Sequence, residues 1–443
     1  MKREQNFTQG PILPALLKFA LPVLLALLLQ AMYGAVDLQV VGRFGTAADI
    51  SAVSTGSQIM QSLTIIVTGL SMGVTVLLGQ KIGEGKPREG GAVVGSGICL
   101  FGAVALILTA AVLAAAPQMA ELMHAPADAF AGTVSYVRIC AGGFVFIIAY
   151  NLLGSIFRGL GDSKMPLLTV LIACILNIIG DLLLVAGLRM GVAGAAIATV
   201  FAQAVSVLLS LLIIRRRELP FTLTHAELHP DWTILARILR LGLPIALQDL
   251  LVSLSFLVVI AIANSMGVVA SAGVGVAEKL CAFVMLVPSA YMQSMSAFVA
   301  QNIGAGREDR ARKALWTGVL SSLVAGLIMA WAGFFHGDML AGIFAEDPAV
   351  VLAGWEYLKA YAIDCLLTSF LFCFIGYFNG HGQTLFVMIQ GFLGAFGVRL
   401  PVALVVSRLG GSLFHLGLST PVSSLVQILL CLGFYHYRKR KYA

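Results

Sequence analysis

Two aspartates stand inside stretches of sequence that are otherwise apolar. Asp37 lies near the end of the first hydrophobic stretch, and Asp181 lies in the fifth. An aspartate at the centre of a membrane-spanning helix costs about 2.5 to 3.5 kcal/mol of insertion free energy, so the pair costs on the order of 5 to 7 kcal/mol unless protein or water surrounds it. A hydrogen bond between membrane helices returns only about 0.6 kcal/mol. These acids are therefore predicted to form a functional site for a proton or a cation.

Polar residues accompany each acid at helical spacing. Gln30, Tyr33 and Asp37 occupy positions i, i+3 and i+7 of the first stretch. Asn177 precedes Asp181 by four residues in the fifth. Residues at these intervals lie on one face of a helix, so each helix is expected to present a polar stripe. Two carboxylates held close in a poorly hydrated cavity should titrate as one coupled unit, poised to exchange a proton near neutral pH.

The composition is that of a membrane protein. Of the 443 residues, 59% are hydrophobic and 11% are charged, against about 25% charged residues in soluble proteins. Twelve apolar stretches approach the length of about 20 residues that a membrane helix requires. They are expected near residues 15–38, 50–78, 92–116, 133–156, 166–187, 192–214, 240–263, 270–300, 314–335, 352–378, 384–406 and 412–436. We predict an all-α polytopic membrane protein with twelve transmembrane helices.

Positive charges fall mainly on one side of this topology. If both termini share a side, 20 of the 28 Lys and Arg residues fall there. The five on the opposite side are Arg43, Arg138, Arg189, Lys359 and Arg408. The positive-inside rule then predicts a multi-pass protein of the cytoplasmic (inner) membrane with both termini in the cytoplasm. The net charge of +7 is explained by this topology, and no nucleic-acid partner is needed to account for it.

Cofactor and metal motifs are not recognised in the sequence. The seven cysteines lie inside apolar stretches without metal-binding spacing, and we interpret them as buried hydrophobic residues. The segment GEGK at Gly83 to Lys86 has neither the preceding strand nor the following Ser or Thr of a phosphate-binding loop, and we interpret it as a turn. We therefore expect no cofactor, and no metal other than a coupling ion.

Two segments recur at a constant interval. GQKIGEGK from Gly79 returns as AQNIGAGR from Ala300, and FRGLGDSK from Phe157 returns as FNGHGQTL from Phe378. The interval is 221 residues in both cases. Six spans per half imply two six-helix lobes related by a pseudo-two-fold axis along the membrane normal, with a substrate path expected between them. We predict an N-lobe at 1–214, a cytoplasmic linker at 215–239 and a C-lobe at 240–443.

Taken together, these features resemble the multidrug and toxic compound extrusion (MATE) family. The resemblance rests on the twelve spans in two parallel halves, the two repeated segments, and the pattern Pro22, Asp37 and Gly42-Arg43-Phe44-Gly45. Prokaryotic members carry a cation site in the N-lobe, built from residues of spans one, four, five and six. The resemblance implies that the matching residues here are Tyr33, Asp37, Asn151, Asn177, Asp181 and Thr199.

The C-lobe departs from one branch of the family, which has a Glu on span seven and an Asp on span ten. This chain has Val252 and Thr368 at those positions, with Asp249 and Asp364 about one turn away. These two acids are expected either to contact substrate or to be neutralised by the basic residues of spans eight and eleven, Lys279 and Arg399. The candidates for lining a substrate cavity are Gln30, Gln248, Asp249, Tyr361, Asp364 and Thr368.

The resemblance implies a secondary antiporter that exports organic, cationic compounds in exchange for H⁺ or Na⁺ by alternating access. The coupling ion stays open, because Asp37, Asp181 and their neighbours suit a shared proton as well as a Na⁺ ion held by Asp37, Asn177, Asp181 and Thr199. We expect a monomer whose partners are small organic molecules and the lipid bilayer.

Three other classes of membrane protein fit the sequence less well. A flippase for lipid-linked precursors or glycans would need a strongly cationic central cavity, whereas few Lys or Arg residues lie inside the spans. A membrane-embedded enzyme would need a nucleophile with its base, or a metal cluster, and neither is found in the sequence. An ion channel suits two repeated halves with buried titratable groups less well than alternating access does. We therefore expect a transporter and not an enzyme.

Overall fold

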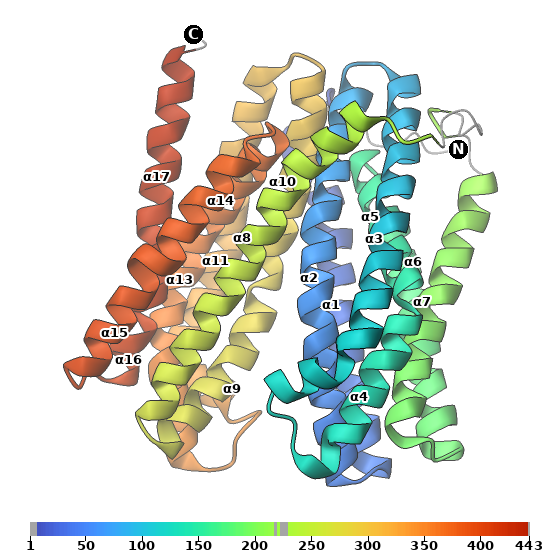
Figure 1. Cartoon of the computed structure of the whole chain (residues 1–443). Helices are drawn as coiled ribbons and strands as arrows, with labels where there is room; N and C mark the ends of the chain where they lie inside the picture. Colours follow the sequence, from blue (N-terminus) through green and yellow to red (C-terminus); the bar gives the residue numbers. More distant parts are fainter. Residues whose placement is uncertain (1–6, 217–218, 222–228, 442–443) are drawn as a thin grey trace. The chain divides into compact units, whose positions relative to one another are not determined.

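The computed structural model describes residues 7–216, 219–221 and 229–441 (Figure 1). Among these described residues, eleven helices are long and apolar enough to cross a membrane, and two shorter helices, Ala127–Gly142 and Phe144–Gly159, bent by 55°, make a twelfth span if the pair crosses as one. The predicted all-α polytopic fold is confirmed. Part of the predicted linker, residues 217–218 and 222–228, lies outside the described residues.

The helices form two compact units. Leu21–Ala246 belong to the first unit, and Phe7–Ala20 with Leu247–Ala443 form the second. The first helix of each half is therefore divided: the early part of α1 belongs to the second unit, and the early part of α8 belongs to the first. Pro22 and Pro244 lie close to the two points of division, and a proline inside a helix removes a backbone hydrogen bond and favours a bend there. The predicted lobe boundaries stay a prediction.

The first unit consists of long helices that run beside one another (Figure 1). Its elements are the later part of α1 (Ile12–Phe44), α2 (Ala47–Gly83), α3 (Pro87–Leu122), α4 (Ala127–Gly142), α5 (Phe144–Gly159), α6 (Lys164–Asp181), the π-helix η1 (Leu182–Gly187), α7 (Gly191–Arg216) and the early part of α8 (Trp232–Ser265). A capping box starts α2, because Thr46 Oγ1 accepts from the Asp49 backbone and the Asp49 carboxylate accepts from the Thr46 backbone. The break between α4 and α5 falls at Gly143, where a Cβ atom would overlap Val200.

Helix α2 lies at the centre of the first unit. In the apolar 18-residue stretch of α2, 67% of the residues are buried, against 17% in that of α3. Helix α2 contacts both α4 and α5. Glycines let the early part of α8 approach closely: a Cβ at Gly73 would lie 2.6 Å from the carbonyl oxygen of Ile238 and 2.9 Å from the backbone nitrogen of Gly242. Small residues of this kind allow membrane helices to pack backbone against backbone.

The second unit is arranged around α13, in whose apolar 18-residue stretch 67% of the residues are also buried. Besides the early part of α1 and the later part of α8, its elements are α9 (Val268–Val284), α10 (Leu286–Gly304), α11 (Glu308–Phe335), α12 (Gly337–Ala341), α13 (Pro348–Gly380), α14 (Thr384–Phe392), η3 (Leu393–Arg399), α15 (Leu400–Arg408), α16 (Leu413–Gly417) and α17 (Ser419–Lys441). Arg310 fixes the residues before α1 to this unit by donating to the carbonyl oxygens of Phe7, Gln9 and Gly10 at 2.7 to 2.9 Å. The Phe7 ring packs against Phe298 with centroids 5.1 Å apart.

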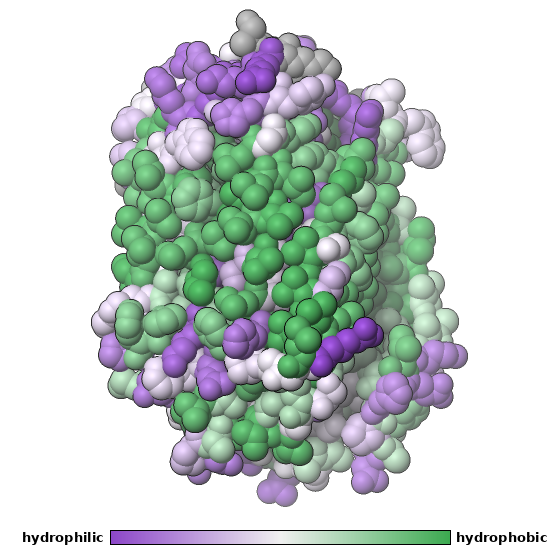
Figure 2. All heavy atoms as spheres, turned by 90° about the vertical axis from the view of Figure 1, so that its left-hand side faces the viewer, coloured by the Kyte–Doolittle hydropathy of each residue, from purple (hydrophilic) through white to green (hydrophobic). Residues whose placement is uncertain are grey.

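The surface matches a bilayer environment. Figure 2 shows a face on which apolar side chains form a broad band between more hydrophilic ends. Large apolar residues are well exposed on the long helices, for example Leu320 and Ile328 on α11. An apolar area of this extent is rare on soluble monomers and suits contact with acyl chains.

Cysteine labelling tests the predicted orientation. We expect cysteines placed at Arg88 and Asp309, which are exposed and follow the two repeated segments, to react with a membrane-impermeant thiol reagent only from the cytoplasmic side. The nearby Gly85 and Gly306 have φ values of +70° and +69°, where a side chain costs about 1 kcal/mol. Cys99, which is only half-buried, should be replaced by serine in the background. Reaction of either site from outside intact cells would contradict both the orientation and the parallel repeat.

Candidate functional site

Asp37 and Asp181 lie together inside the first unit. Asp37 on α1 is 5% exposed, and Asp181, the last residue of α6, is fully buried. Their carboxyl groups are close enough to interact, yet neither oxygen of Asp181 has a hydrogen-bond partner. Two ionised carboxylates offer only acceptors, so they can form a hydrogen bond with each other only when one of them carries a proton.

Thr199 on α7 links Asp37 to Asn177. Its hydroxyl lies 3.3 Å from Asp37 Oδ2 and 3.1 Å from the carbonyl oxygen of Ala195. It also accepts from Asn177 Nδ2 at 3.4 Å. A hydroxyl has a single hydrogen, so Thr199 donates either to Asp37 or to Ala195, and not fully to both.

The cluster contains four buried oxygen atoms without partners. They are Asp37 Oδ1, Asn177 Oδ1 and both carboxyl oxygens of Asp181. Buried polar atoms are normally hydrogen-bonded, and each one left unsatisfied costs about 1 to 3 kcal/mol. A proton shared by the acids, or a cation bound among these oxygens, would remove much of this cost.

Local packing explains how α6 brings its polar residues to α7. A Cβ at Gly180 would lie 2.9 Å from the Cβ of Ala198, so the two helices touch where the site is formed. The π-helix η1 begins directly after Asp181. Single π-helical turns are rare and occur frequently at functional sites.

Two residues of α4 complete the surroundings and were not predicted from the sequence. Tyr136 and Cys140 are buried and both interact electrostatically with Asp37. Gly56 on α2 leaves room for the Tyr136 ring, because a Cβ there would lie 2.6 Å from Tyr136 Cδ1. The only sequence signal was the i, i+3, i+7 spacing of Thr133, Tyr136 and Cys140. None of the three is an acid, so the spacing alone did not indicate an ion site.

Gln30 and Asn151 each contact other partners than the two acids. Gln30 Nε2 donates to the Tyr150 hydroxyl at 3.2 Å. Asn151 Oδ1 accepts from Thr68 at 3.1 Å, and its Nδ2 donates to the carbonyl oxygen of its own helix at 2.8 Å. The structure thus brings together Asp37, Asn177, Asp181 and Thr199 and places Asn151 against α2. The roles assigned to these residues stay predictions.

Tyr33 lies on the same polar stripe as Asp37. It is half-buried on α1, one turn from Asp37, and it interacts electrostatically with both Asp37 and Tyr150. The predicted polar stripe of α1 therefore joins the acid pair to Tyr150 and its partner Gln30.

The second unit contains buried charges of its own. Arg399, at the end of η3, donates to Ser255 Oγ at 2.8 Å and lies 4.1 Å above the centre of the Phe256 ring. It also interacts electrostatically with Asp364 and with Glu278. Among the predicted neutralising groups, Arg399 is thus placed near Asp364, whereas Lys279 is exposed.

The other predicted cavity residues of the second unit are mostly buried. Asp364 Oδ1 has no partner, and the Thr368 hydroxyl donates to the carbonyl oxygen of Asp364 at 2.9 Å, within its own helix. Tyr361 and Gln248 are also buried, and Asp249 is half-buried. Whether these residues contact substrate stays a prediction.

A family model confirms the resemblance noted in the sequence. The MatE model matches residues 22–183 and 244–405, so each match covers five spans of one half. These tandem matches, together with the twelve-span fold, define a membrane transporter. The chain belongs to the MATE family of efflux transporters.

Relatives and solved structures match over nearly the whole chain. Probable multidrug resistance protein YpnP of Bacillus subtilis is 26% identical over 437 residues, covering 98% of this chain and 96% of YpnP. Multidrug export protein MepA of Staphylococcus aureus is 25% identical over 425 residues, covering 93% of this chain and 91% of MepA. A crystal structure of MATE in complex with MaL6 superposes with a TM-score of 0.92 at 20% identity, covering 99% and 98% of the two chains. That likeness shows the shared two-lobe fold.

Substitutions in the second unit separate substrate contact from ion coupling. We expect Asp364→Asn and Asp249→Asn to change substrate affinity about tenfold or more, as for loss of a hydrogen bond to a charged group, while ion-driven transport persists. Equilibrium dye binding and ΔpH- or ΔpNa-driven uptake in proteoliposomes measure the two effects, with the exposed Asp338→Asn as control. Loss of ion-driven transport with intact substrate binding would place the coupling site in this unit instead.

Proposed function

We propose that this protein exports organic, cationic compounds in exchange for H⁺ or Na⁺, and that Asp37 and Asp181 bind the coupling ion. The observation behind this proposal is the group of four unpartnered oxygens on Asp37, Asn177 and Asp181. The names of YpnP and MepA, multidrug resistance and multidrug export proteins, support a broad range of exported compounds. Membership of the MATE family supports export as the direction of transport.

A proton changes the hydrogen bonds of the site in a defined way. When Asp37 is ionised, it accepts from Thr199; when it is protonated, it can donate to Thr199 or to Asp181, and the Thr199 hydroxyl can turn to the carbonyl oxygen of Ala195. Protonation also removes the repulsion between the two carboxylates. The protonated and ionised pairs therefore favour different positions of α1 relative to α6 and α7, which is the differential interaction that an ion-driven change requires.

The division of α1 offers a route from the ion site to the rest of the protein. The helix carries Asp37 in the first unit, while its residues before Leu21 belong to the second. A movement of α1 that follows the protonation of Asp37 therefore displaces residues of both units. Pro22 lies next to the point of division and makes that point a natural hinge.

A Na⁺ ion is the alternative occupant. The unpartnered oxygens of Asp37, Asn177 and Asp181, with the Thr199 hydroxyl, are oxygen ligands of the type that hard cations prefer. If two monovalent ions enter for each monovalent organic cation that leaves, one net elementary charge moves inward, and a potential of 100 mV then yields about 2.3 kcal/mol for either ion. At about 1.4 kcal/mol per tenfold concentration ratio, this sustains a gradient of roughly 40-fold.

Charge-neutral substitutions test the proposed coupling. We expect Asp37→Asn and Asp181→Asn each to yield a folded protein that binds substrate but no longer responds to ΔpH or ΔpNa, because an amide cannot exchange the ion. Dye efflux from proteoliposomes under imposed gradients measures the response, and Asp128→Asn, exposed in the first turn of α4, serves as a matched control. Gradient-driven efflux at the wild-type rate in both variants would contradict the proposal.

Thr199→Val distinguishes the two coupling ions. If the ion is Na⁺, the variant lacks a ligand and needs a higher Na⁺ concentration for half-maximal transport. If it is H⁺, ionised Asp37 has lost a donor, so the pH of half-maximal transport rises. A hydrogen bond to a charged group contributes about 1.5 to 3 kcal/mol, so the shift should be about tenfold or more in ion concentration. Thr199→Ser, which keeps the hydroxyl, should behave like the wild type, and an unchanged ion dependence in Thr199→Val would exclude Thr199 from the site.

A further inference from the structure

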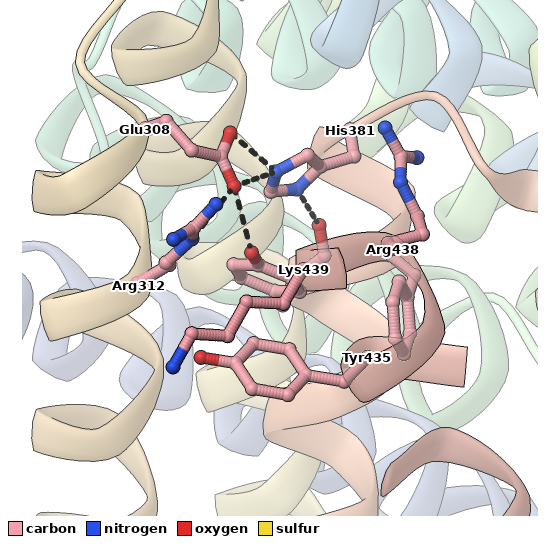
Figure 3. A pocket seen from close by; sticks show the side chains of 8 residues that line it. Glu308, Arg312, His381, Tyr435, Arg438 and Lys439 are labelled. Atoms are coloured by element: carbon pink, nitrogen blue, oxygen red, sulfur yellow. Dashed lines mark hydrogen bonds and ion pairs between the residues drawn. The ribbon is translucent and has the colours of Figure 1, made fainter. Parts of the chain in front are cut away.

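A hollow of about 300 Å³ lies where three helices of the second unit end (Figure 3). Glu308 and Arg312 belong to the first turns of α11, and His381 follows the last residue of α13. Arg438 and Lys439 come from the last turn of α17. We call this hollow the basic pocket, because four of these five side chains can be cationic.

The one acid of the basic pocket is already engaged. The Glu308 carboxylate lies 3.1 and 3.2 Å from His381 Nε2, and it accepts from the Tyr377 hydroxyl at 3.2 Å. It also accepts from Arg312 Nε at 3.3 Å. Arg312 keeps the four other N–H groups of its guanidinium for a further acceptor.

His381 holds the Glu308 carboxylate in place. Its Nδ1 lies 2.9 Å from the carbonyl oxygen of Tyr377, and its Nε2 faces the Glu308 carboxylate. Arg312, Arg438 and Lys439 carry three positive charges around the hollow, against the single negative charge of Glu308.

The fold does not require this concentration of charge. Glu308, Arg312 and His381 are replaced in the first half, at the interval of 221 residues, by Pro87, Gly91 and Leu160, whereas Arg438 corresponds to Arg217. The first half forms the same helices without the first three side chains. The second half alone therefore groups Glu308, Arg312 and His381 at the hollow, although the formation of the helices does not require it.

The position of the basic pocket indicates the class of ligand that suits it. Three helices that are long and apolar enough to cross a membrane end around it, and the ends of such helices lie at the lipid headgroups or beyond them. Tyr435 forms part of its wall, and tyrosines are enriched at this boundary. Basic pockets between membrane helices suit anionic headgroups, and guanidinium groups pair with phosphate through two hydrogen bonds. We propose that the basic pocket binds one phosphate-bearing anion, supplied by the headgroup of an anionic phospholipid.

The test compares two variants with the same change in charge. Arg312→Gln, Arg438→Gln and Lys439→Gln together remove three cations of the basic pocket. Arg237→Gln, Lys313→Gln and Arg440→Gln together remove three exposed cations that do not line it. Native mass spectrometry of the full-length protein in detergent measures retention of phosphatidylglycerol against phosphatidylcholine.

We expect the wild-type protein to retain one phosphatidylglycerol in preference to phosphatidylcholine. Each cation near a membrane surface is worth about fivefold in affinity for anionic lipid, so the pocket variant should bind on the order of a hundredfold more weakly. The control variant should stay within about twofold of the wild type, since its three cations do not line the pocket. Equal retention of phosphatidylglycerol by both variants would overturn the lipid site.

A second variant keeps the proposal testable if the triple variant does not fold. Lys439→Gln removes one exposed cation of the basic pocket and should weaken phosphatidylglycerol binding about fivefold. Wild-type affinity in a folded Lys439→Gln variant would contradict the proposal.

Soluble anions separate the two possible sources of the phosphate group. Inorganic phosphate and glycerol 3-phosphate, added at millimolar concentration, should not displace phosphatidylglycerol if the bilayer supplies the ligand. Displacement that disappears in the pocket variant would keep the phosphate site but assign it to a soluble anion. If neither lipid nor soluble phosphate binding depends on the pocket cations, the proposal is wrong.

Discussion

The burial of two carboxyl groups in a bundle surrounded by lipid is the constraint on which the first unit depends. Each oxygen that stays unpaired costs free energy, and Asp37, Asn177 and Asp181 leave four of them unpaired. The unit shields this cluster from lipid by close helix contacts, which glycines such as Gly56 and Gly180 permit. A site built in this way changes its internal hydrogen bonds when it gains or loses a single positive charge, which is the property that an ion-coupled transporter requires.

The fifth span contains a π-helical segment in each half, next to a charged residue. In the first unit η1 begins directly after Asp181, and in the second unit η3 ends at Arg399. A π-turn interrupts the regular hydrogen bonding of the helix and displaces the side chains that follow, and such turns are frequent at functional sites. The two halves thus share a local distortion but place an acid beside it in one case and a base in the other. This difference is consistent with ion coupling in the first unit and a distinct role in the second.

The sequence predicted what local pattern and composition determine, and missed what distant contacts determine. The twelve spans followed from apolar length, the repeat from a constant interval, and the polar stripe of each helix from helical spacing, whereas the partnership of Asp37 with Asp181 was implied by the resemblance to the MATE family. The bend at Gly143 depends on Val200, and the position of Asn151 depends on Thr68 of another helix. Neither partner can be found from local spacing. Tyr136 was missed for the same reason, because only the fold brings α4 beside Asp37.

The central claim is that Asp37 and Asp181 titrate as one unit, and infrared difference spectroscopy of carboxyl protonation in the reconstituted protein tests it most directly. The pH titration of Asp37 should be followed in the wild type and in a protein whose Asp181 is replaced by asparagine. Our account predicts that removing the neighbouring charge moves the titration of Asp37 to lower pH by about one unit or more, because a neighbouring carboxylate disfavours the ionised form and interacting groups share their apparent titration steps. Titration of Asp37 at the same pH in both proteins would contradict the account.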